Sequence, residues 1–163
     1  MSEEREILTW PQFGEASRQL ATIVHDAGYR PDIILTIARG GLPIGGALAY
    51  ALSVKNCYVM NVEYYTGVDE RLDFPVILPP QLQLIDIENA TVLVADDVAD
   101  TGHTLKAVFD YVAGRVGEAR SAVLYEKPQS LIKCEYVWKR TERWIDFPWS
   151  SRPPVHDSDA MSH

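Results

Sequence analysis

The chain has 163 residues, of which 47% are hydrophobic, and its 23 acidic and 15 basic residues give a net charge of −8. This length and hydrophobic content suit one globular domain that buries a core without disulfides or a structural metal. The negative charge argues against a nucleic-acid partner, because a basic surface supplies most of the affinity for DNA or RNA. No apolar stretch has the length that a bilayer requires, so we expect no membrane segment and no membrane partner.

The two cysteines, Cys57 and Cys134, lie far apart in the sequence and form no metal-binding motif. We therefore expect two free thiols in a reducing compartment. The polar N-terminal residues resemble no export signal, because they lack the apolar core of a signal peptide. Together these features predict a cytoplasmic protein.

In chain order, Thr9, Trp10 and Pro11 predict the start of a helix, which Gly28 ends. After this helix, short apolar runs rich in β-branched residues predict buried strands, and the segments between some of them predict further helices. The predicted strands cover 32–37, 56–62, 91–95 and 121–125, and the further helices cover 43–52 and 105–112. Residues 63–84 have no clear period and contain several prolines, which predicts a long loop.

The alternation of strands and helices predicts an α/β fold, in which helices flank a twisted, mainly parallel sheet. Ligands of such sheets bind outside the carboxyl ends of the strands. This rule indicates residues 38–41, 96–104 and 126–128. From Ser150 the chain is polar and contains prolines, so we expect residues 150–163 to form a disordered tail after a single domain, residues 1–149.

The most informative segment is Val92–Leu105, which reads VLVADDVADTGHTL. An apolar strand leads to two adjacent acids, Asp96 and Asp97, and a turn of small residues then leads into a helix. The N–H groups of the first helical turn form an anion site, and Thr101 and Thr104 add hydroxyl donors. Carboxylates repel a phosphate, so Asp96 and Asp97 suit ribose hydroxyls and a Mg²⁺ ion instead. A turn with ordinary capping residues would explain only one acid and one threonine.

This segment resembles the motif that binds 5-phosphoribosyl 1-diphosphate (PRPP) in the type I phosphoribosyltransferases. The resemblance implies the type I fold with a small C-terminal hood at about residues 128–149. It implies that Asp97 binds Mg²⁺, with Asp96 as a second candidate ligand, and that Asp100 exchanges a proton with the acceptor base. The PRPP-binding residues that it implies here are Asp96, Asp97, Asp100, Thr101, Gly102, His103 and Thr104. His103 replaces the usual glycine or lysine at a position that contributes mainly its backbone.

Two other segments resemble parts of the same family. Arg39 and Gly40 follow the first apolar strand, where the family binds pyrophosphate through a loop that often contains a cis peptide. Arginine is a suitable bidentate partner for a phosphate group, although a tight turn would also explain this sequence. The segment from Glu63 to Arg71 resembles the flexible catalytic loop, in which Arg71 would contact the diphosphate. A solvated charged loop is the alternative.

Lys127 follows a predicted strand, at the position where purine-specific members bind the 6-oxygen of the base. The alternative is a surface lysine in a turn. The segment from Trp144 to Trp149 resembles the hood of xanthine-guanine phosphoribosyltransferases. There Trp144 would stack on the base and the backbone of Ile145 would read its edge, whereas Phe147 and Trp149 suit the core or a dimer contact.

The resemblance implies an enzyme of purine salvage that transfers the phosphoribosyl group of PRPP to guanine, xanthine or hypoxanthine and releases pyrophosphate. It also implies a homodimer or homotetramer. Three alternatives stay open at this point. One is action on another acceptor, the second is a PRPP-sensing regulator, and the third is a phosphoacceptor receiver domain, whose acidic pocket Asp96 and Asp97 would resemble. The receiver alternative leaves the glycine- and threonine-containing loop without a function.

Overall fold

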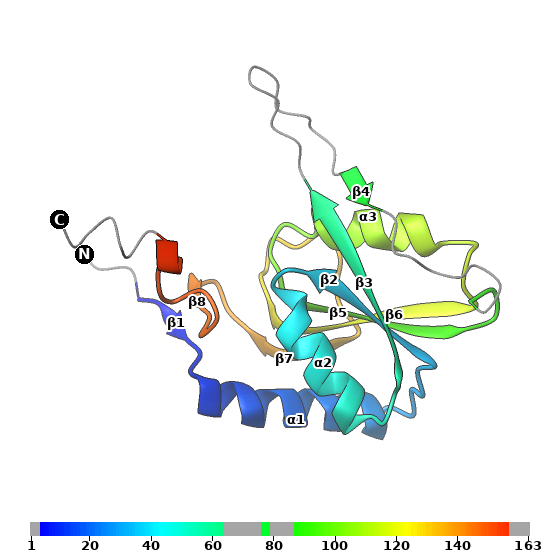
Figure 1. Ribbon diagram of the computed structural model, residues 1–163, viewed down its shortest axis with the longest axis horizontal. Coiled ribbons are helices and arrows are strands. Elements are labelled where there is room, and N and C mark those ends of the chain that lie inside the picture. Colours follow the sequence, from blue (N-terminus) through cyan, green and yellow to red (C-terminus); the bar gives the residue numbers. More distant parts are fainter. Residues whose placement is uncertain (1–3, 64–75, 79–86, 157–163) are drawn as a thin grey trace, which may run out of the picture.

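The computed structural model describes residues 4–63, 76–78 and 87–156. Its centre is a six-stranded sheet in the order β4-β3-β2-β5-β6-β7, in which only the β3–β4 pair is antiparallel (Figure 1). These strands are β2 (Ile33–Ala38), β3 (Asn56–Glu63), β4 (Val76–Leu78), β5 (Thr91–Ala99), β6 (Glu118–Glu126) and β7 (Tyr136–Arg140). The predicted α/β fold with a mainly parallel sheet is confirmed.

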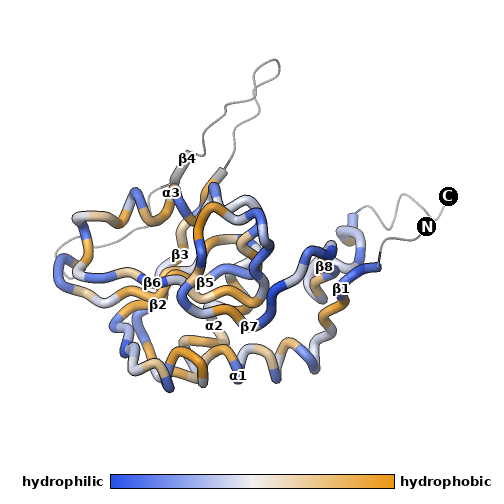
Figure 2. Tube along the Cα trace, turned by 180° about the vertical axis from the view of Figure 1, so that it is seen from behind, coloured by the Kyte–Doolittle hydropathy of each residue, from blue (hydrophilic) through white to orange (hydrophobic). Residues whose placement is uncertain are grey.

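Helices cover both faces of this sheet. The helices are α1 (Trp10–Asp26), α2 (Gly41–Ala51) and α3 (His103–Val112). Figure 1 shows α1 and α2 on one face and α3 on the other. Successive strand residues point to opposite faces, so β5 contributes Leu93 to the α1/α2 side and Val92 and Val94 to the α3 side. The sheet strands carry much of the apolar surface that is buried on both faces (Figure 2).

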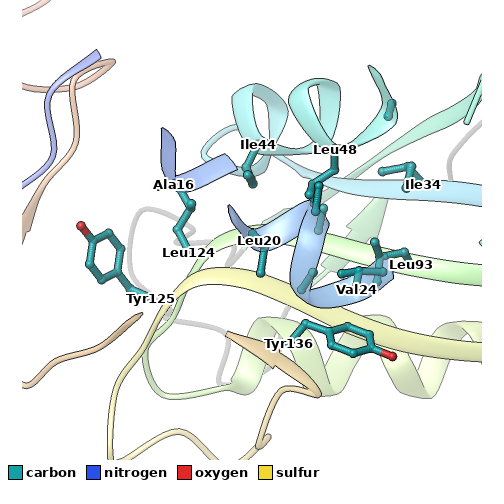
Figure 3. Packing of buried hydrophobic residues seen from close by; sticks show 14 of the residues in the cluster. Ala16, Leu20, Val24, Ile34, Ile44, Leu48, Leu93, Leu124, Tyr125 and Tyr136 are labelled. Atoms are coloured by element: carbon teal, nitrogen blue, oxygen red, sulfur yellow. The ribbon is translucent and has the colours of Figure 1, made fainter. Parts of the chain in front are cut away.

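The start of α1 follows from its sequence. The Oγ1 atom of Thr9 accepts a hydrogen bond from the Gln12 N–H, and the Gln12 side chain accepts one from the Thr9 N–H. This reciprocal capping, with Pro11 in the first turn, confirms the predicted helix start. The apolar side of the helix then packs into the core, where Figure 3 shows Leu20 and Val24 together with Leu48 of α2.

The segment predicted as a hood forms a small sheet with the N-terminal end of the domain, which the sequence did not indicate. Strand β1 (Glu6–Ile7) pairs in parallel with β8 (Ile145–Asp146), and together they form a separate two-stranded sheet. We call this two-stranded sheet of β1 and β8 the hood. Side chains add three ion pairs between residues 4–6 and residues 139–146: Arg5 with Asp146, Glu6 with Lys139 of β7, and Glu4 with Arg143. Residues 6–7 therefore pair with part of the segment that the sequence predicts as a hood, at about residues 128–149.

Other boundaries differ from the predicted ones. Strand β5 continues beyond Ala95 to Ala99, and a short strand, β4, lies within the segment predicted to be only a loop. Strands β7 and β8 were not predicted, because each is short and lacks a long apolar run. Residues 150–156 are exposed, and the rest of the predicted tail lies outside the described residues. Among the described residues, no helix is both long and apolar enough to cross a bilayer.

Candidate active site

Two adjacent acids lie near the carboxyl end of β5. Asp96 is only 8% exposed, and its Oδ1 atom accepts a hydrogen bond of 2.9 Å from the Asp97 N–H. The Oδ1 atom of Asp97 accepts one of 2.7 Å from the Val98 N–H. Burial raises the pKa of both carboxyl groups, and the neighbouring Asp97 raises the pKa of Asp96 further. A cation or a pair of hydroxyl donors would offset the cost of holding both charges here.

The loop after β2 lies directly against these acids. The peptide bond between Ala38 and Arg39 is cis. A Cβ atom on Gly40 would lie 2.2 Å from the Oδ2 atom of Asp97, and one on Gly41 would lie 2.7 Å from the carbonyl oxygen of Ala95. A larger residue at either position would push the loop away from the acids. The glycines therefore allow the loop that carries the exposed Arg39 to reach Asp97.

The loop between β5 and α3 has the features of an anion site. Gly102 has a φ of 85°, which is the left-handed region that favours glycine, and α3 begins at the next residue. The Oγ1 atom of Thr101 accepts a hydrogen bond of 3.3 Å from the His103 N–H. A cavity of about 80 Å³ is lined by this loop, including Asp100, Thr101 and Thr104. Such a helix start presents N–H groups to a small anion.

A turn that follows β6 packs against this loop. The backbone N–H of Lys127 donates to the carbonyl oxygen of Ala99 at 2.9 Å, and that of Leu131 donates to Thr101 at 2.8 Å. Between them, the Nε2 atom of Gln129 donates to the Oδ1 atom of Asp100 at 2.7 Å. No local sequence pattern indicates Gln129, because its contact with Asp100 joins two loops and spans 29 residues of the chain.

Lys127 lies between this turn and the hood. Its side chain is buried, with 8% of the residue exposed, and the surface-lysine alternative is therefore wrong. The Nζ atom donates to the carbonyl oxygen of Arg143 at 2.6 Å and lies 3.5 Å from that of Glu142. The ammonium group thus reaches the residue immediately before Trp144.

The hood offers an exposed aromatic ring beside a strand that bonds β1 along one edge. Trp144 is 63% exposed, and Ile145 beside it is buried. The N–H groups of Glu6 and Leu8 donate to the carbonyl oxygens of Trp144 and Asp146, at 2.8 and 3.0 Å. Because backbone groups alternate in direction along a strand, the N–H and C=O of Ile145 face away from β1. They therefore take no part in the pairing with β1.

The neighbouring aromatic residues belong to the core, as predicted. Phe147 is 8% exposed, and its ring stacks on that of Trp149 with centroids 4.9 Å apart. The Trp149 ring also meets Phe13 of α1 edge to face at 5.4 Å. These contacts anchor the hood to the main domain and leave Trp144 as the exposed ring of the segment.

The predicted site residues therefore lie on loops at one edge of the sheet and on the hood that Lys127 contacts. Arg39 and Gly40 follow β2, Asp96 to Thr104 lie at the end of β5 and beyond it, and Lys127 follows β6. Parallel neighbouring strands bring these ends together. Arg71 lies outside the described residues.

Comparison with known proteins agrees with this arrangement. Residues 4–158 match the family model of the phosphoribosyl transferase domain. The chain is 28% identical over 153 residues to the xanthine-guanine phosphoribosyltransferase of Roseobacter denitrificans, covering 87% of this chain and 83% of that protein. It is also similar to a purine phosphoribosyltransferase from Pyrococcus horikoshii, whose crystal structure matches with a TM-score of 0.79. The sequence identity is 34%, and the match covers 93% of this chain and 97% of that one.

A xanthine-guanine-hypoxanthine phosphoribosyltransferase from Helicobacter pylori shares the fold, with a TM-score of 0.79 at 23% identity over 98% of this chain and 100% of that one. The family match spans most of the sequence, and the relative from Pyrococcus horikoshii covers it at more than 30% identity. The chain therefore belongs to the phosphoribosyltransferase family. The family membership and the type I fold that the motif predicted are confirmed.

Proposed function

We propose that this chain is a purine-salvage phosphoribosyltransferase of the cytoplasm, which transfers the phosphoribosyl group of PRPP to guanine, xanthine or hypoxanthine and releases pyrophosphate. The observation that carries this proposal is the junction at Lys127. Its backbone bonds the loop proposed to hold PRPP, and its buried ammonium group reaches the hood beside an exposed tryptophan. The names of the relatives from Roseobacter denitrificans and Pyrococcus horikoshii support a purine as the acceptor. Base-dependent release of pyrophosphate from PRPP tests the proposal.

The sugar phosphate would bind along the β5–α3 loop. The N–H groups from Gly102 to Thr104 and the hydroxyls of Thr101 and Thr104 would hold the 5′-phosphate. Asp96 and Asp97 would accept hydrogen bonds from the ribose hydroxyls. Arg39 and the backbone beside Gly40 would bind the diphosphate, and Arg71 would add a second guanidinium group.

The two acids also fit a Mg²⁺ ion. Magnesium prefers oxygen ligands and is often bound through one or two carboxylates together with substrate phosphates. Within the described residues no cluster of three histidine, cysteine or acidic side chains that could hold a metal ion occurs. Asp97, with Asp96, would hold the ion, which when bound would neutralise charge on the departing diphosphate.

The acceptor base would lie between the β5–α3 loop and the hood. Trp144 would stack on its flat face, and the backbone of Ile145 would bind its edge. The Nζ atom of Lys127 would donate to the 6-oxygen. Asp100 would exchange a proton with the imidazole nitrogen that attacks the anomeric carbon. The protein would contribute chiefly by positioning and by charge stabilisation, because this carbon passes through a cation-like state.

We also propose that the chain assembles as a homodimer or homotetramer. Helix α2 has no charged side chain, and its sequence is apolar on all sides. Leu42 and Tyr50 on this helix are 43% and 92% exposed, and Val59 of neighbouring β3 is 48% exposed. An uncharged surface of this kind suits contact between two copies of an acidic chain.

Removal of Mg²⁺ should weaken the binding of PRPP much more than the binding of a nucleoside monophosphate. Both molecules carry a 5′-phosphate and a ribose, but only PRPP carries a diphosphate, whose charge Mg²⁺ held by Asp97 would offset. We expect chelation of Mg²⁺ to weaken PRPP binding at least about tenfold and to leave GMP binding within about twofold, since a tenfold change corresponds to about 1.4 kcal/mol. Calorimetric titration of both ligands, with and without Mg²⁺, measures this. Equal PRPP affinities in the two conditions would remove the metal from Asp97.

A further inference from the structure

The turn at residues 127–132 is held by its own hydrogen bonds. The Ser130 N–H donates to the carbonyl oxygen of Lys127 at 3.1 Å, and the Ser130 hydroxyl donates to that of Ile132 at 2.7 Å. The Nζ atom of Lys133 closes the turn by donating to the carbonyl oxygen of Pro128 at 3.0 Å. Ser130 is buried, at 4% exposed. These hydrogen bonds therefore fix the conformation of the turn.

This turn is fixed to the β5–α3 loop on both sides of Gln129. Backbone hydrogen bonds join Lys127 to Ala99 and Leu131 to Thr101. Close packing adds to them, since a Cβ atom on Gly102 would lie 2.7 Å from the Leu131 nitrogen. The main chain of Gln129 is thus anchored two residues before and two residues after it. Its side chain therefore reaches Asp100 from a main chain that is held in position.

The contact between Gln129 and Asp100 limits the orientation of an exposed carboxylate. The amide Nε2 atom donates to Oδ1 at 2.7 Å, which occupies one of the two carboxylate oxygens. The other oxygen, Oδ2, is left for a second partner. A neutral amide orients a carboxylate without the strong attraction of a lysine or arginine. Fixed orientation of a proton-transfer group lowers the entropy cost of reaching the transition state.

We propose that Gln129 is a positioning residue for Asp100, holding Oδ1 so that Oδ2 faces the acceptor base. This inference rests on the proposed function, in which Asp100 exchanges a proton with the base. The same turn begins with Lys127, so the group that recognises the 6-oxygen and the group that orients the acid belong to one rigid segment. Binding of the base and placement of the acid are thereby joined through six consecutive residues, 127–132.

A double-mutant cycle tests the positioning role. Gln129→Ala should lower kcat about tenfold, which corresponds to about 1.4 kcal/mol of activation free energy, with the KM for PRPP within about twofold. Gln129→Glu keeps the length but places a carboxylate beside Asp100, and it should lower kcat further. In an Asp100→Asn background, Gln129→Ala should cause little additional loss, because the group that it orients no longer transfers a proton.

Lys133→Ala is the matched control, since it removes an exposed side-chain hydrogen bond of the same turn without touching Asp100, while the backbone bonds of Lys127 and Leu131 that anchor Gln129 remain. We expect the kcat of this variant to lie within about twofold of that of the chain without substitutions, because substitutions of exposed side chains usually have small effects. Three results would overturn the inference and leave the proposed function standing. The first is a loss of kcat in Lys133→Ala equal to that in Gln129→Ala, and the second is an unchanged kcat in Gln129→Glu. The third is full additivity of the kcat losses of Gln129→Ala and Asp100→Asn. An unchanged chain that releases no pyrophosphate with any purine would overturn the proposed function, and the inference with it.

Discussion

Asp100→Asn is expected to lower kcat by a factor of about 10² to 10⁴, the range typical of a group that transfers a proton in the transition state. Asparagine keeps the size of the side chain and still accepts the hydrogen bond from Gln129, but it cannot take up a proton at neutral pH. PRPP should bind as before, because the anion site and the two acids of β5 are unchanged. The loss should therefore appear in kcat and not in the affinity for PRPP.

Steady-state kinetics, PRPP titration and thermal melting on the same protein distinguish this role from a structural one. A helix-capping role would lower the melting temperature and spare turnover. The structure already disfavours it, because the N-cap of α3 is Gly102 and the His103 N–H at the start of that helix donates to the Thr101 hydroxyl, not to Asp100. Near-normal kcat together with a lowered melting temperature would remove Asp100 from the mechanism.

Lys127→Ala should weaken binding of the purine by about 1–3 kcal/mol, since the 6-oxygen would lose a charged donor in a closed site. The affinity for PRPP should stay within about twofold, because the bond to Ala99 comes from the backbone N–H of Lys127 and survives the change. Kinetics with guanine, xanthine and hypoxanthine, compared with direct PRPP titration, measures both effects.

Lys127 also supports the hood through the carbonyl oxygen of Arg143, so a matched pair of variants is needed. Lys127→Met keeps much of the buried volume and should lose base affinity to a similar degree. Lys139→Ala removes the half-exposed lysine of β7 that pairs with Glu6 of the hood, and it should leave base affinity nearly unchanged. An equal loss of PRPP and base affinity in Lys127→Met would give Lys127 a structural role and contradict its proposed contact with the base.

Local signals in the sequence were sufficient for the main domain. Apolar runs with β-branched residues predicted β2, β3, β5 and β6, and the cap at Thr9 predicted the start of α1. The rule that ligands bind at the carboxyl ends of parallel strands then grouped the three loops of the site. These inferences depend only on neighbouring residues and on a general property of parallel sheets.

The missed features depend on contacts between distant parts of the chain. Strand β1 pairs with β8, although Glu6 and Ile145 are far apart in sequence and each strand has only two residues. No local period reveals so short a pair. The role proposed for Gln129 likewise depends on a turn packing against another loop. Strand β5 was predicted too short, because Asp96 and Asp97 interrupt its apolar pattern while its backbone stays paired with β6.

The most direct test is release of pyrophosphate from PRPP and Mg²⁺ in the presence of single nucleobases. The proposed function predicts release with at least one of guanine, xanthine and hypoxanthine, together with formation of the matching nucleoside monophosphate. Adenine, which lacks the 6-oxygen, and uracil should give much slower release, and Asp100→Asn should abolish most of the signal. No base-dependent release with any 6-oxopurine, or equal release with uracil, would contradict the proposed function.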